Sequence, residues 1–144
     1  RDLLVITGPP MHKENDTGIA RIFSLFDGKK VICGGTTANI LARELNRQIR
    51  VQLKNPDSQV PPFSEMDGAD LVTEGIITMG KVAEMLEKGD QSAYSHENAA
   101  TKLVEMFLDS DRIQFVVALL RQKNDLIQEI HDFLFQPYMV IQFH

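Results

Sequence analysis

The sequence predicts an α/β fold in which a mostly parallel sheet is flanked by helices in a three-layer sandwich. Short apolar runs alternate with segments whose apolar residues recur at helical spacing, and the chain contains no internal repeat. The first run, residues 3–7, is typical of a strand buried on both faces of a sheet. The chain has 144 residues, of which 43% are hydrophobic. This composition fits one domain, residues 1–144, with a full hydrophobic core.

Local patterns predict the elements that follow the first strand. Asp16 or Thr17 can cap a helix whose apolar residues, through Phe26, recur at helical spacing, and Asp27 and Gly28 close it. The patterns then predict, in order, a strand over 31–33, a helix over 37–45 that stops at Asn46, and a half-exposed edge strand over 49–53.

Residues 54–68 are rich in Pro, Asp, Ser and Asn, so we expect a loop that packs over the sheet. Its segment 60–63 should be extended, because each proline disfavours helix in the residue before it. Ser95 is the expected cap of a helix that ends at Leu108. The other expected elements are strands over 69–73, 113–120 and 138–143 and helices over 79–86 and 126–134.

Composition and charge narrow the class of protein. The formal net charge of −5, without a cluster of Lys and Arg, argues against a nucleic-acid partner. No apolar run approaches the roughly 18 to 20 residues that span a bilayer, and no charged-then-apolar leader is present, so we expect no membrane partner and a cytoplasmic protein. The single cysteine, Cys33, fits a reducing compartment, and its place at a strand end favours a buried thiol over a reactive one.

The most informative segment is residues 29–42, where an apolar strand runs into Gly34-Gly35-Thr36-Thr37 and then into a helix. Glycines let a ligand approach the backbone, threonine hydroxyls can contact it, and the helix start offers N–H groups with the positive end of the helix dipole. The turn matches neither the dinucleotide fingerprint nor the phosphate loop, and it more closely resembles the strand-Gly-Thr-Thr-helix turn of phosphosugar-binding domains. An anion site and a purely structural turn both fit it.

Two other strand ends carry similar turns. Gly8 follows the first predicted strand, and Glu74 follows the strand over 69–73. Because the carboxyl ends of parallel strands share one edge of a sheet, we expect these turns to line a single pocket. The predicted ligand-binding residues are Gly8, Gly34, Gly35, Thr36, Thr37 and Glu74.

Glu74 is the carboxylate that this pattern singles out. It can accept hydrogen bonds from a sugar hydroxyl, or join Asp16 or Asp70 around a divalent ion. The alternative is a carboxylate that only caps the following helix. The four histidines, at 12, 96, 131 and 144, have no metal-ligand spacing, and Cys33 has no evident histidine partner. The sequence therefore assigns no catalytic residue, metal ligand or cofactor.

Four ordered segments, residues 7–10, 29–40, 60–62 and 70–78, together resemble one family. It is the C-terminal region of bacterial phosphatases similar to the stage II sporulation protein E type, and the resemblance extends to about Gly89. It implies an accessory domain whose partner, a metal-dependent serine/threonine phosphatase domain with the metal-binding aspartates, lies upstream. The chain opens directly on Arg1 and a strand, so we also expect a fragment of a longer protein.

Two functions follow from these observations. The first is a non-catalytic regulatory domain that binds a phosphorylated or anionic small molecule at the strand-end turns and signals to the attached phosphatase. The alternative is a protein-interaction or dimerisation module without a small-molecule ligand. An independent enzyme is a third interpretation, with Glu74 as its acid or base.

Overall fold

The computed structural model describes residues 1–8, 15–51, 63–88, 98–117 and 140–143. Its elements are β1 (Asp2–Thr7), α1 (Asp16–Leu25), β2 (Lys29–Cys33), α2 (Gly35–Leu45), β3 (Ile49–Val51), β4 (Ser64–Met66), β5 (Leu71–Thr73), α3 (Gly75–Lys88), α4 (Ala99–Leu108), β6 (Arg112–Val117) and β7 (Val140–Phe143). They form one sheet of seven strands in the order β3-β4-β5-β2-β1-β6-β7. Strands β5, β2, β1, β6 and β7 pair in parallel, whereas β4 is antiparallel to both its neighbours. The predicted α/β class is confirmed.

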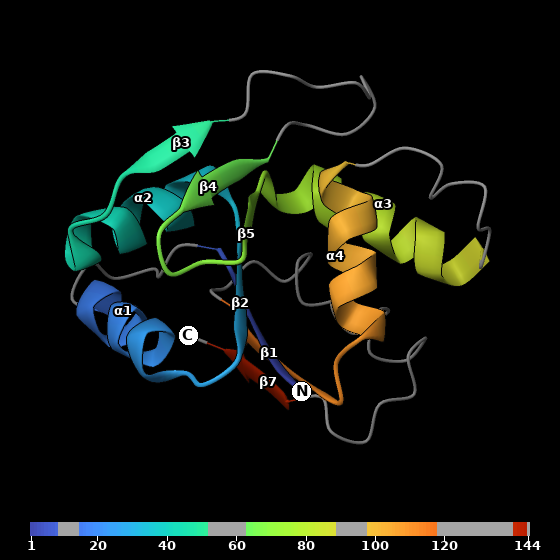
Figure 1. The fold of residues 1–144 in the computed structure, drawn as a ribbon, viewed down its shortest axis with the longest axis horizontal. Helices are drawn as coiled ribbons and strands as arrows, with labels where there is room; N and C mark the ends of the chain where they lie inside the picture. The colour runs from blue at the N-terminus through green and yellow to red at the C-terminus, as the bar shows by residue number, and fades with distance from the viewer. Residues whose placement is uncertain (9–14, 52–62, 89–97, 118–139, 144) are drawn as a thin grey trace.

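Helices cover both faces of the sheet, with α1 and α2 on one side and α3 and α4 on the other (Figure 1). Alternate residues of each strand point to opposite faces. Leu4 and Ile6 of β1 belong to the core under α1 and α2, and Leu3 and Val5 belong to the core under α3 and α4. The three layers are therefore those that the alternating pattern predicts. No helix in the described ranges is long and apolar enough to cross a membrane.

Some element ends confirm the local patterns. Asn46 ends α2 in the left-handed conformation, with φ of 54°, as expected for a helix stop. β3 is an edge strand, as the alternation at 49–51 predicts. The cap of α1 differs from the expectation, because Asn15 occupies the N-cap position and Asp16 lies in the first turn. Thr17 is likewise inside the helix.

Other element boundaries correct the prediction. The expected loop over 54–68 contains β4, a three-residue strand too short to show a period. α3 begins at Gly75 rather than 79, because tertiary packing overrides the weak helix propensity of the β-branched run at its start. The cap of α4 is Asn98, whose side chain and that of Thr101 form a reciprocal capping box.

Several expectations lie outside the described residues. They are the extended segment 60–62, the cap at Ser95, the helix over 126–134, the strand residues 118–120 and 138–139, and the four histidines at 12, 96, 131 and 144.

Candidate functional site

The four central parallel strands end at one level of the sheet. Thr7 pairs with Cys33 and with Val117, and Cys33 pairs in turn with Thr73. The turns that begin at Gly8, Gly34 and Glu74 therefore share one edge, which we call the carboxyl edge. The prediction that these turns share an edge is confirmed. β6 joins the sheet beside β1 after the chain has built β2 and β5 on the other side, so this edge also contains the topological switch point.

Two of these turns touch each other. The Gly34 N–H donates to the Thr73 carbonyl oxygen at 2.7 Å, and a Cβ added to Gly75 would lie 3.6 Å from the Gly34 Cα. Gly34 has φ of 122°, a conformation that residues with a side chain rarely adopt. This glycine lets α2 start immediately beside α3, so the positive ends of both helix dipoles lie together.

The start of α2 keeps its backbone donors available. The first bond of the helix runs from the Ala38 N–H to the Gly34 carbonyl at 3.0 Å, and no side chain caps the helix. The N–H groups of Gly35, Thr36 and Thr37 therefore have no helical acceptor. Neither α2 nor α3 has an acidic residue in its first turn. Such a helix start is suited to an anion.

Three buried threonine hydroxyls at these turns lack hydrogen-bond partners among the described residues. They belong to Thr37, Thr73 and Thr78, which are exposed by 1%, 2% and 0%. The Thr37 Oγ1 lies in the first turn of α2, 3.6 Å from the position that a Cβ on Gly34 would occupy. Each unpaired buried hydroxyl costs about 1–3 kcal/mol of folding free energy. Native proteins satisfy most such groups, so their concentration at one edge indicates a site.

A cavity of about 170 Å³ adjoins these turns. Its described lining residues are Gly35, Ala38 and Asn39 of α2, Ile49 and Val51 of β3, Ser64 of β4, Val72 and Thr73 of β5, and Glu74. Pockets for drug-sized ligands are about 300–1,000 Å³, so this cavity suits a smaller molecule. A Cβ added to Gly35 would meet no atom within 4 Å, so this glycine faces open space.

The cavity combines some of the predicted residues and leaves others outside. Gly35 and Glu74 both line it, although they come from different turns. Gly34, Thr36 and Thr37 lie in the adjoining turn, and Gly8 is buried at the end of β1. The described lining of this cavity, between α2 and the β3–β4 hairpin, includes only these two predicted residues, so the expectation that all the turns line a single pocket stays a prediction.

The carboxylates do not converge as a divalent ion would require. Asp16 is 4% exposed and forms an ion pair with Arg43 at 2.6 Å. The hydrogen bond to Asp16 raises the pKa of the Arg43 guanidinium. Asp70 precedes β5, at the opposite end from Glu74, and accepts the Lys30 N–H at 2.8 Å. Within the described ranges no group of three or more His, Cys, Asp or Glu residues could hold a metal. The expected pairing of Glu74 with either aspartate is therefore wrong.

Glu74 itself has no hydrogen bond or ion pair within the described part of the chain, and its side chain is exposed. Glu74 directly precedes α3, so the alternative, a carboxylate that only caps this helix, stays open. Cys33 is buried, as expected, with its Sγ 3.8 Å from the Met79 Sδ.

Sequence reasoning missed the hairpin side of the cavity. Ser64 lies in what reads as a loop, and only its pairing with Val72 brings it to the site. Asn39 lies one turn into α2, on the same side as Gly35. Thr78 belongs to a segment whose β-branched residues conceal the helix start. No local pattern marks any of these three residues.

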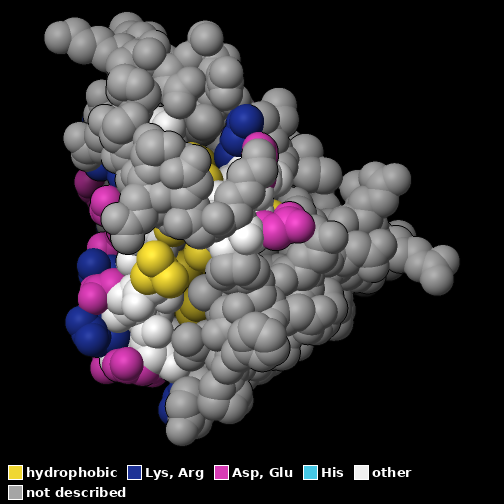
Figure 2. All heavy atoms as spheres, turned by 90° about the vertical axis from the view of Figure 1, so that its right-hand side faces the viewer, with side chains coloured by type: hydrophobic (Ala, Val, Ile, Leu, Met, Phe, Trp, Pro, Cys, Tyr) yellow, Lys and Arg dark blue, Asp and Glu magenta, His cyan; other side chains and the backbone are white. Residues whose placement is uncertain are grey.

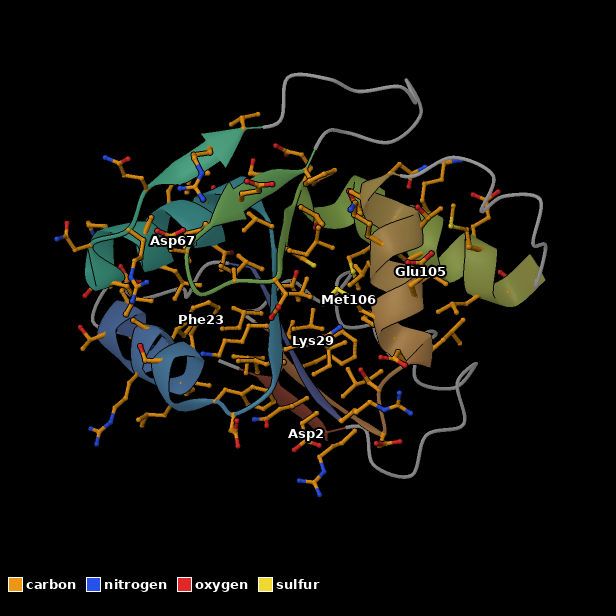
Figure 3. The ribbon with its side chains drawn as sticks, in the orientation of Figure 1. Asp2, Phe23, Lys29, Asp67, Glu105 and Met106 are labelled. Atoms are coloured by element: carbon orange, nitrogen blue, oxygen red, sulfur yellow. The ribbon has the colours of Figure 1, made fainter. Side chains whose placement is uncertain are left out.

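A wider hollow of about 520 Å³ lies elsewhere, where Lys29 of β2 faces Glu105, Met106, Leu108 and Asp109 of the α4 end (Figure 3). Figure 2 shows the face that α3 and α4 cover. Acidic and basic side chains alternate along one margin of this view, next to a small group of hydrophobic side chains. The hollow is far from the predicted turns, and Asp109 already pairs with Arg1 at 2.7 Å. None of its described lining residues carries an unpaired buried group like those of the carboxyl edge.

Comparison of this chain with known protein families, with curated proteins and with solved structures finds no match. The resemblance to the C-terminal region of sporulation-type phosphatases therefore stays a prediction. The carboxyl edge, with its two touching helix starts, its unpaired hydroxyls and its adjoining cavity, is the candidate functional site.

Proposed function

We propose that this chain is a non-catalytic binding domain that holds a small anionic molecule at the carboxyl edge and regulates an attached serine/threonine phosphatase domain. One observation carries the binding part of the proposal. The buried hydroxyls of Thr37 and Thr78 in the first turns of α2 and α3, and of Thr73 at the end of β5, have no partner among the described residues, and Thr73 also lines the cavity.

Hydrogen-bond donors outnumber acceptors at the start of α2. The first N–H groups of α2 and the threonine hydroxyls are donors without acceptors. An anion supplies several acceptor lone pairs at once, and it is further stabilised by the positive end of the helix dipole. The ligand thus offsets part of the cost that these groups impose on the empty fold.

The regulatory part of the proposal is supported by the resemblance alone. The segments that carry it include the turns at Gly34 and Glu74, which form the site. A domain that changes stability when a ligand binds can pass that change to a covalently attached neighbour.

The test is Gly35→Val with Gly18→Val as its matched control. Both glycines are helical and exposed, and neither would place a Cβ within 4 Å of another atom, but only Gly35 lines the cavity. Thermal shift against a panel of phosphorylated and carboxylated metabolites would find the ligand, since a ligand at about 100 times its Kd stabilises by about 2.7 kcal/mol. We expect Gly35→Val to lose this shift and Gly18→Val to keep it. Equal shifts in both variants would remove this turn from the site.

One observation favours the alternative of an interaction module. β3 is an edge strand, and its Val51 is 58% exposed. Exposed apolar edge strands are templates for pairing with another chain. If no compound stabilises the wild-type chain and the chain sediments as a dimer, this alternative holds.

A further inference from the structure

We infer that the cavity beside Glu74 selects a small zwitterion, an α-amino acid with a compact apolar side chain, over a phosphate ester. This inference rests on the proposed function and names the ligand class of the same site: the carboxylate of the zwitterion is the anionic group at the start of α2. It starts from an electrostatic mismatch between the site and a simple anion. The cavity contains one helix start that attracts negative charge and one carboxylate that repels it.

The charges that line the cavity leave a net negative charge. A helix start is equivalent to about half a positive charge. The Glu74 carboxylate carries a full negative charge and has no partner in the described part of the chain. The described lining residues include no lysine, arginine or histidine. A phosphate dianion would therefore meet net repulsion, whereas a ligand with both a carboxylate and an ammonium group complements both ends.

The spacing of the two ends suits an α-amino acid. Gly35 follows β2 and Glu74 follows β5, and these strands are direct neighbours joined by the 2.7 Å bond from Gly34 to Thr73. Neighbouring strands lie about 4.8 Å apart. The carboxylate and ammonium groups of an α-amino acid are attached to the same carbon atom, so they can reach adjacent turns together. Charge-assisted hydrogen bonds would then form at both ends.

The rest of the lining accounts for the side chain of the ligand. Ala38, Ile49, Val51 and Val72 supply apolar surface from the helix, the hairpin and β5. The volume of about 170 Å³ leaves room for a small apolar group and excludes a large one.

The experiment compares ligands that share one carbon skeleton. L-valine, 2-hydroxyisovalerate and isovalerate carry an ammonium group, a hydroxyl group and hydrogen at the same carbon, and inorganic phosphate serves as the simple anion. Calorimetric or NMR titration of the wild-type chain should give the order valine, hydroxy acid, isovalerate. We expect the loss of the ammonium group to weaken binding by about tenfold or more.

Glu74→Gln tests the residue, with Glu105→Gln as its control, because Glu105 is an exposed carboxylate outside the cavity. Glu74→Gln should weaken the binding of L-valine by about tenfold and leave the affinity for isovalerate unchanged or higher. Glu105→Gln should change neither affinity. An unchanged melting temperature confirms that both variants fold.

Three other results would overturn the inference. They also separate its failure from a failure of the proposed function. If isovalerate, the hydroxy acid or phosphate binds the wild-type chain as tightly as valine, the site binds small anions without selecting a zwitterion. If none of the four binds, the zwitterion inference fails, and the proposed function then depends on the wider metabolite panel. Equal losses of valine binding in Glu74→Gln and Glu105→Gln would show that Glu74 does not contact the ammonium group.

Discussion

The two ends of the parallel strands differ in how completely their polar groups are paired. At the end where the strands begin, Asp70 accepts the Lys30 N–H at 2.8 Å and donates its own N–H to the Lys30 carbonyl at 2.8 Å. Arg1 at the start of β1 pairs with Asp109 at 2.7 Å, and Asp2 lies near Arg112 at 3.9 Å. We call this end, where Asp2 and Lys29 are seen in Figure 3, the amino edge.

The carboxyl edge has the opposite character. Among the described residues, the buried hydroxyls of Thr37, Thr73 and Thr78 have no partner, and the cavity-lining carboxylate of Glu74 is unpaired. Proteins tolerate locally unfavourable arrangements at functional sites and compensate for them elsewhere. The difference between the two edges therefore separates the part of the fold that provides stability from the part available for binding.

Glycine substitutions give the largest expected difference between the edges. At the amino edge Gly28 has φ of 148°, and an added Cβ would lie 2.5 Å from the Asp2 carbonyl oxygen. Gly28→Ala should lower the free energy of unfolding by about 2–4 kcal/mol, because it combines backbone strain with a backbone clash. Gly35→Ala, in open space at the start of α2, should change it by less than about 1 kcal/mol. Urea denaturation measures both values.

A large loss of stability in Gly35→Ala would mean that this glycine is needed by the fold. The comparison of edges would then fail at the residue on which the binding proposal depends most. Gly80→Ala, also in open space but within α3, provides the reference for a harmless substitution.

The sequence predicts the edge better than it predicts the cavity. The turns at Gly8, Gly34 and Glu74 are local signals, and the parallel direction of the strands brings them to one level. The cavity wall from Ser64 depends on a three-residue strand and a single pairing with Val72, which no periodicity reveals. The position of Asp70 is missed for a related reason, since a strand boundary placed two residues early moves this carboxylate from before the strand to within it.

Threonine substitutions provide a second test of the comparison, with effects of opposite sign. The Thr101 hydroxyl accepts the Asn98 N–H at 2.9 Å and donates to the Asn98 carbonyl at 3.0 Å. Thr101→Val should therefore destabilise the protein by about 1–2 kcal/mol. The Thr73 hydroxyl is equally buried but has no partner in the described structure, so Thr73→Val should stabilise the protein by about 1 kcal/mol.

Thermal unfolding without ligand measures both changes under the same conditions. If Thr73→Val destabilises as Thr101→Val does, the Thr73 hydroxyl has a partner beyond the described residues, and the carboxyl edge is as well paired as the amino edge. If the expected signs are found, a ligand at the site should stabilise wild-type protein more than Thr73→Val.

The smallest expected effect compares the two carboxylates that bracket β5. Asp70→Ala removes the acceptor of the Lys30 N–H and should cost about 1 kcal/mol of stability. Glu74→Ala removes an exposed, unpaired side chain and should change stability by no more than about 0.5 kcal/mol. Chemical denaturation of the two variants beside wild type gives both numbers. A cost at Glu74 equal to that at Asp70 would mean that Glu74 stabilises the start of α3, since a carboxylate there interacts favourably with the helix dipole. Its role would then be structural, and Glu74 would not be a free negative charge that pairs with the ammonium group of a zwitterionic ligand.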